Sequence, residues 1–223
     1  MFVNPQHMKL SIDAIEEKIG MSYASGIWGP LTASIWALGV NPGHPKCIAD
    51  DISTYSPDLH DRCSLFDHPD RYSSNLGRIL GTSGGNLEKM LVSNVVSDRN
   101  SHDAKGVNSR DWEMGVERMT RLIDVFHPSI VVALTRAGER NVSLGLRQRL
   151  AKMGYTIDLV RERILSPAKS KKPLTFRPCT WRVNKGDTII HLLEIVNHPS
   201  RPYSVSDFAL ADIEREFASV QLN

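Results

Sequence analysis

The chain has 223 residues, 41% of them hydrophobic and 23% charged, and a formal net charge of only +2 at pH 7. These values are ordinary for one soluble globular domain, and they neither demand nor exclude a polyanionic partner. The sequence has no run of about eighteen apolar residues, so we expect no membrane-spanning helix. The first residues lack the basic-then-apolar layout of a signal peptide. The three cysteines, Cys47, Cys63 and Cys179, are too widely spaced for a zinc or iron–sulfur motif or a disulfide framework, so we expect no metal, no cofactor and a cytoplasmic location.

Helix and strand signals alternate along the first half of the chain. They predict, in order, a helix over 9–20, a core strand over 34–39, a polar loop to about residue 73, a short helix over 74–81 and a strand over 90–96. The polar loop is rich in Asp, His, Ser and Pro, and loops of this length are uncommon unless they are functional.

The second half continues the alternation. Apolar residues at spacings of three and four predict a helix over 110–126, capped by Asn108 or Ser109 and stopped by Pro128. The remaining signals predict a strand over 130–134, a helix over 136–152, strands over 155–160 and 188–196, and a helix over 206–219.

This order of elements predicts an α/β protein with three layers, α/β/α, around a central, mostly parallel four-stranded sheet. The four core strands would end at Gly39, Val95, Leu134 and Val196, and all four ends would lie along one edge. We expect one domain over 1–223, with a basic insertion at about 161–187.

The insertion contains eight Lys or Arg residues between Arg161 and Lys185, Lys171 and Lys172 among them, and only one acidic residue, Glu162. Charge alone leaves two interpretations open. The segment is either a solvated loop or a surface that faces phosphates, where each cation displaces a counterion.

Two turns stiffened by proline follow predicted strands. Asn41-Pro42-Gly43 comes after the first core strand, and His198-Pro199-Ser200 comes after the last. Ligands of open α/β sheets bind outside the carboxyl ends of the strands, so Asn41 and His198 would face one crevice. Taken singly, each turn fits an ordinary structural role, as do Asn94 at a strand end and Phe66 in the core.

Taken together and in order, these segments resemble the uracil-DNA glycosylase superfamily. The resemblance is closest to its mismatch-specific branch, with some motifs like the thermophile-type branch, and it covers roughly residues 30–220 without much of 161–187. The matching segments are Gly39–Gly43, Phe66–Tyr72, Leu91–Val96, Pro128–Leu134 and His198–Ser200.

The resemblance implies a glycosylase-like fold and a base flipped out of the DNA stack into a pocket. In that pocket, Phe66 would stack on the base and the amide of Asn94 would bind the pyrimidine edge. His198 would donate a hydrogen bond to the O2 atom of the departing base, and Asn41 would orient the attacking water.

The same resemblance implies contacts with the DNA around the flipped nucleotide. Ser200 would clamp a phosphate, and Arg201 or Tyr203 would enter the gap left by the base. We expect the partner to be double-stranded DNA, with single-stranded DNA left open, and we expect the protein to be a monomer.

The chain departs from the family pattern at two points. The four cysteines that hold an iron–sulfur cluster in the thermophile-type branch have no counterpart here. Gly43 stands where strict uracil enzymes carry a bulky aromatic gate, so the pocket would admit 5-substituted pyrimidines, such as the hydroxymethylated or glucosylated cytosine of phage DNA. Repair of host DNA and defence against modified foreign DNA are both compatible with this pattern.

The leading hypothesis is a monofunctional glycosylase that leaves an abasic site, since neither catalytic turn carries a lysine for Schiff-base chemistry. A catalytically silent DNA-binding module on the same fold is the alternative. A third hypothesis, an unrelated phosphate-binding doubly wound protein, would need a glycine-rich loop, and Gly81–Gly85 lacks the preceding strand and the Lys-Ser/Thr ending.

Overall fold

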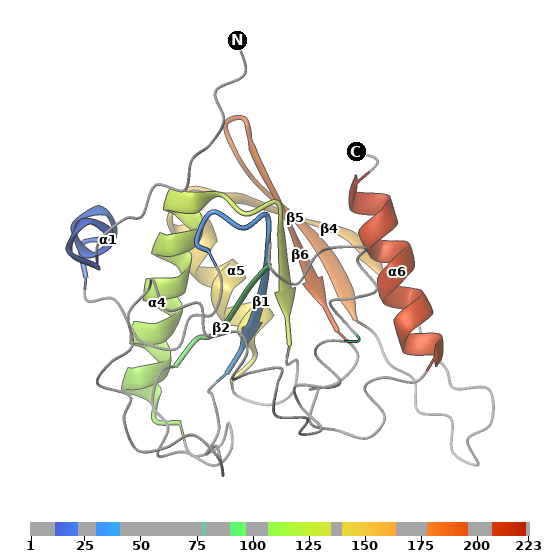
Figure 1. Ribbon diagram of the computed structural model, residues 1–223, viewed down its shortest axis with the longest axis horizontal. Helices are drawn as coiled ribbons and strands as arrows, with labels where there is room; N and C mark the ends of the chain where they lie inside the picture. Colours follow the sequence, from blue (N-terminus) through green and yellow to red (C-terminus); the bar gives the residue numbers. More distant parts are fainter. Residues whose placement is uncertain are drawn as a thin grey trace.

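The computed structural model describes residues 12–21, 30–40, 78, 90–96, 107–134, 140–163, 178–195 and 207–221. Four of its helices have defined bounds: α1 (Ile12–Ile19), α4 (Ser109–Phe126), α5 (Val142–Lys152) and α6 (Asp207–Gln221). Its strands are β1 (Ile35–Gly39), β2 (Met90–Asn94), β3 (Ile130–Ala133), β4 (Thr156–Glu162), β5 (Cys179–Lys185) and β6 (Thr188–Glu194), and they form one sheet (Figure 1).

The sheet has six strands in the order β2-β1-β3-β6-β5-β4. The first four are mutually parallel, whereas β5 runs antiparallel to both β6 and β4. The expected α/β class is therefore confirmed, but the expectation of a four-stranded sheet is wrong. The four predicted core strands are all present and adjacent, and β5 and β4 extend the sheet beyond them.

The sequence prediction missed β5 because its residues lie in the segment interpreted as a basic insertion. Strand formers are present there, since the segment contains Thr180 and Val183, which are buried, and Trp181, which is half-buried. Gly186, with φ of 57°, then allows the tight turn from β5 into β6. Antiparallel pairing with β6 makes this charged segment a strand of the sheet.

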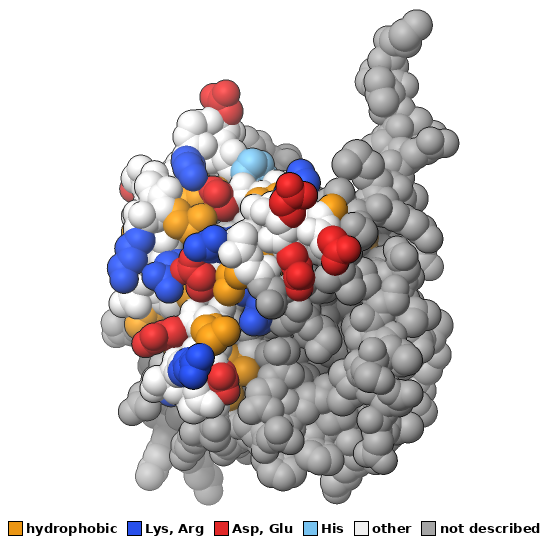
Figure 2. Space-filling view, turned by 90° about the vertical axis from the view of Figure 1, so that its left-hand side faces the viewer, with side chains coloured by type: hydrophobic (Ala, Val, Ile, Leu, Met, Phe, Trp, Pro, Cys, Tyr) orange, Lys and Arg blue, Asp and Glu red, His pale blue; other side chains and the backbone are white. Residues whose placement is uncertain are grey.

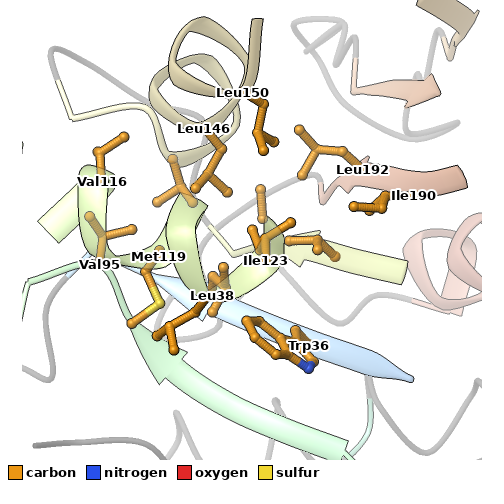
Figure 3. Close-up of a cluster of buried hydrophobic side chains, with 14 of the residues drawn as sticks. Trp36, Leu38, Val95, Val116, Met119, Ile123, Leu146, Leu150, Ile190 and Leu192 are labelled. Carbon is orange, nitrogen blue, oxygen red and sulfur yellow. The ribbon is translucent and has the colours of Figure 1, made fainter. Parts of the chain in front are cut away.

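The helices lie on both faces of the sheet (Figure 1). α4 and α5 pack over one face, where they bury Trp36 and Leu38 of β1 together with Leu192 of β6 in the larger core cluster (Figure 3). α6 covers the other face, where Ile213 and Phe217 join a second cluster of strand residues. Three layers follow, as predicted.

The helix caps explain two of the boundaries. The side chain of Asn108 accepts a hydrogen bond of 2.8 Å from the N–H of Asp111, so Asn108 is the N-cap of α4. α5 starts later than predicted because Asn141 caps it, accepting 3.0 Å from the N–H of Leu144.

Candidate functional site

The carboxyl ends of the four parallel strands are level. Gly39 of β1 pairs with Asn94 of β2, Leu38 pairs with Ala133 of β3, and Ala133 pairs with Glu194 of β6. The strand ends lie within two residues of the predicted positions and share one edge of the sheet, as the sequence predicts.

This edge contains the point at which the order of the strands reverses. From β1 the chain continues to β2 on one side, whereas from β3 it continues toward β6 on the other side. A reversal of this kind opens a crevice outside the carboxyl ends of the two central strands. Neighbouring strands lie about 4.8 Å apart, so β1 and β6, with β3 between them, leave the sheet about 10 Å apart.

Asn94 is the one predicted site residue that the structure describes. It is the last residue of β2, beside Gly39, and its exposed fraction is 8%. Alternation along the strand places its side chain on the same face as Met90 and Val92, which is the face that α6 covers. Asn94 therefore lies at the end of β2, where the sequence predicts it, and its amide is buried there.

The other predicted site residues lie outside the described residues. They are Asn41, Gly43, Phe66, Lys171, Lys172, His198, Ser200, Arg201 and Tyr203. The nearest described neighbours are Val40, one residue before Asn41, and Ile195, three residues before His198. Hydrogen bonds still hold the backbone there, since Val96 donates 2.8 Å to the carbonyl of Val40 and Ile195 donates 3.3 Å to that of Ala133.

Glu194 is a residue at this edge that the sequence analysis missed. Its exposed fraction is 4%, although it is charged and ends a strand that is otherwise mostly apolar. Its carboxylate accepts hydrogen bonds from the hydroxyl of Ser143 at 2.7 Å, the N–H of Cys179 at 3.0 Å and the indole N–H of Trp181 at 3.3 Å. A lone acid inside a predicted buried strand is a signal that could have found it, because such a charge needs partners.

Arg163 binds the same strand end from the opposite face. Its guanidinium donates 2.5 Å to the carbonyl oxygen of Glu194 and 2.7 Å to the carboxylate of Asp212 on α6. Burial lowers the pKa of Arg163 and raises the pKa of Asp212, and the opposite charge of the partner opposes each change.

These contacts correct part of the interpretation of the basic segment. Arg163 is buried in an ion pair, Arg161 lies 2.9 Å from the carboxylate of Glu216, and Lys185 lies 2.8 Å from that of Asp124. The three cations therefore bind acidic groups of the protein itself. A phosphate-facing role of this segment stays a prediction for Lys171 and Lys172.

The flank of the molecule around α1 and α4 carries both signs of charge. Figure 2 shows basic and acidic side chains interspersed on this described surface. A groove of about 210 Å³ lies there, lined by residues that include Lys18, Glu117, Arg121 and Met153. Helices that follow parallel strands run back toward the amino edge, so this groove, near the C-terminal ends of the helices, is remote from the crevice.

Within the described residues, no cluster of His, Cys, Asp or Glu is arranged to hold a metal ion. No helix in the described ranges is both long and apolar enough to span a membrane. No protein-family model matches the chain, and no curated protein matches it.

Proposed function

We propose that the protein is a monofunctional DNA glycosylase that hydrolyses the N-glycosidic bond of a flipped, modified pyrimidine and leaves an abasic site. The level carboxyl ends of β1, β2 and β6 support this proposal. The chain leaves β1 toward Asn41 and β6 toward His198 at the same edge at which Asn94 is buried. One nucleotide at that edge is then within reach of residues from all three strands.

Each residue type suits one part of the reaction. The C1′–N bond breaks while the oxygen of a water bonds to C1′, the electron pair leaves with the base, and the base takes up the proton that the water loses. His198 stabilises the negative charge on O2 of the departing base, and the amide of Asn41 orients the water. The amide of Asn94 offers both a donor and an acceptor to the pyrimidine edge, and Phe66 offers a flat apolar surface.

The proposed substrate class follows from Gly43. A residue without a side chain puts no bulk against the 5-position of the base, so 5-hydroxymethyl or glucosylated hydroxymethyl groups would be admitted. The experiment is a panel of duplexes that contain U, T·G, 5-hydroxymethyl-U or glucosylated hydroxymethyl-C, followed by alkali to break strands at abasic sites. Breaks at a 5-substituted base are expected, and breaks at unsubstituted uracil alone would contradict the open pocket.

The variant Asn41→Ala separates catalysis from binding. Loss of a group that acts on the reacting atoms lowers kcat by about 100-fold or more, while the Kd for DNA changes little. The matched control is Asn184→Ala, because Asn184 lies on β5 near the turn into β6, away from the carboxyl edge. An Asn41→Ala variant with full product formation would refute the assigned role, and DNA binding without product by the unaltered protein would favour the silent binding module.

A further inference from the structure

We propose that Glu194 is a positioning residue, whose carboxylate sets the course of the chain as it leaves β6 toward the segment 197–201. The effect of Glu194 on catalysis, through the position of this segment, rests on the function proposed above. The contacts that carry the inference belong to described residues alone.

A buried carboxylate is costly unless hydrogen bonds replace its water, so its partners show what holds it. The backbone N–H of Cys179 and the indole N–H of Trp181 can only donate. The hydroxyl of Ser143 has one proton, and its oxygen accepts from Nε of Arg147 at 3.3 Å. The Ser143 proton is therefore directed to Glu194, and all three hydrogen bonds run toward the carboxylate.

Both carboxylate oxygens therefore act as acceptors, and two further groups lie beside them. Ser143 lies in the first turn of α5, where the positive end of the helix dipole stabilises an anion. The guanidinium of Arg147 lies 3.8 Å from the centroid of the Trp181 ring, beside the same cluster. Glu194 therefore joins the start of α5 to the end of β6 by a charge-assisted contact.

Contacts from α5, from β5 and from Arg163, the residue after β4, meet at Glu194. α5 and β5 bind its carboxylate on one face of the sheet, through Ser143, Cys179 and Trp181. On the other face, Arg163 binds its carbonyl oxygen and is itself anchored to Asp212 on α6. The direction of the chain at Ile195 is consequently determined from both faces, three residues before His198.

The test is the variant Glu194→Gln, followed by amide hydrogen exchange of peptides that cover 195–206. The Gln amide puts an NH₂ group where one carboxylate oxygen accepts, so at least one buried donor loses its partner. We expect exchange in 195–206 to become about tenfold faster, with the exchange of α4 unchanged. Glu214→Gln is the matched control, since Glu214 is an exposed residue of α6 and should leave every rate unchanged.

Unchanged exchange in 195–206 of a folded Glu194→Gln protein would overturn the inference. If that variant does not fold, Ser143→Ala removes a single donor, and its exchange is measured in the same way. Unchanged exchange in 195–206 of a folded Ser143→Ala protein would then overturn the inference. On a substrate from the duplex panel, a lower kcat with an unchanged KM is expected. Absence of activity in the unaltered protein would refute the proposed function, while the exchange data would still decide the role of Glu194.

Discussion

Tyr155, which lies immediately before β4, has a buried phenol side chain beside an acidic residue of α4. Its hydroxyl donates 2.8 Å to Oδ1 of Asp124, which also accepts 2.8 Å from Nζ of Lys185. Burial and then the contact with Asp124 raise the pKa of Tyr155 far above its usual value. For Asp124, burial raises the pKa, but hydrogen bonds from Lys185 and Tyr155 outweigh it and leave that pKa below the usual range.

Tyr155→Phe tests this contact through the pH dependence of stability. The folded pKa of Tyr155 lies above the unfolded value of about 10, so the folded state holds the proton longer and its stability falls as pH rises above 10. We expect the variant to lose about 1 kcal/mol at pH 7 and to lack the part of the alkaline decline that Tyr155 causes. Urea unfolding between pH 7 and pH 11 measures both effects, and parallel curves for the two proteins would contradict the assignment.

Glu194 and Asn94 illustrate what sequence can reveal at the residue scale. Asn94 was predicted at the carboxyl edge because it ends an apolar strand, and it lies there. Glu194 ends a strand in the same way, but the sequence does not name its partners. Ser143 is 51 residues away, and only folding brings the two together.

At the scale of elements, α4 approaches the end of β2 unusually closely at Gly115. A Cβ at this position would lie 2.1 Å from the carbonyl oxygen of Val95. The contact is with backbone, which cannot move aside as a flexible side chain can. A glycine in the helix interior thereby allows α4 to pack directly beside the residue that follows Asn94.

Gly115→Ala should therefore destabilise the protein, although the same change in an unhindered helix stabilises it by up to about 1 kcal/mol. We expect a loss of about 2–3 kcal/mol in urea unfolding, because either β2 or α4 must shift. Gly145→Ala in α5 is the control. A Cβ there would be 3.1 Å from side-chain atoms of Trp112 and Val116, which can adjust, so its cost should be the smaller. Equal costs would show that the backbone contact is not the cause.

At the scale of the whole molecule, a buried ion pair connects the end of β4 to α6. Arg163 follows β4 and Asp212 lies on α6, with exposed fractions of 4% and 3%. Among the residues that the structure describes, Nε of Arg163 has no hydrogen-bond partner, so the burial of this ion pair is incompletely compensated. The pair connects the strands beyond the parallel core to the helix that covers the second face.

Arg163→Met leaves Asp212 buried without its main partner, and we expect a loss of about 3–5 kcal/mol in urea unfolding. The double variant Arg163→Met with Asp212→Leu should recover most of that loss, because apolar side chains carry no desolvation cost. Arg121→Met is the control. Its pair with Glu117 on α4 is only partly buried, and Glu117 keeps Arg149 as a second partner, so the loss should be about 1 kcal/mol, well below that of Arg163→Met. If the double variant lost as much free energy of unfolding as the two single variants together, the coupling between Arg163 and Asp212 would be refuted.

By itself the sequence determined the α/β class, the four parallel strands and their shared edge, since an apolar run or a helical period is a local property. The sequence also limited the N-cap of α4 to Asn108 or Ser109, because a cap and the N–H that it binds are only two or three residues apart, and the structure assigns Asn108. Only the tertiary structure decided that β5 and β4 extend the sheet, that Arg161 and Arg163 face acids of the protein, and that Glu194 is enclosed at the end of β6. A charged residue is buried or exposed according to partners brought from distant parts of the chain, and local patterns do not contain those partners.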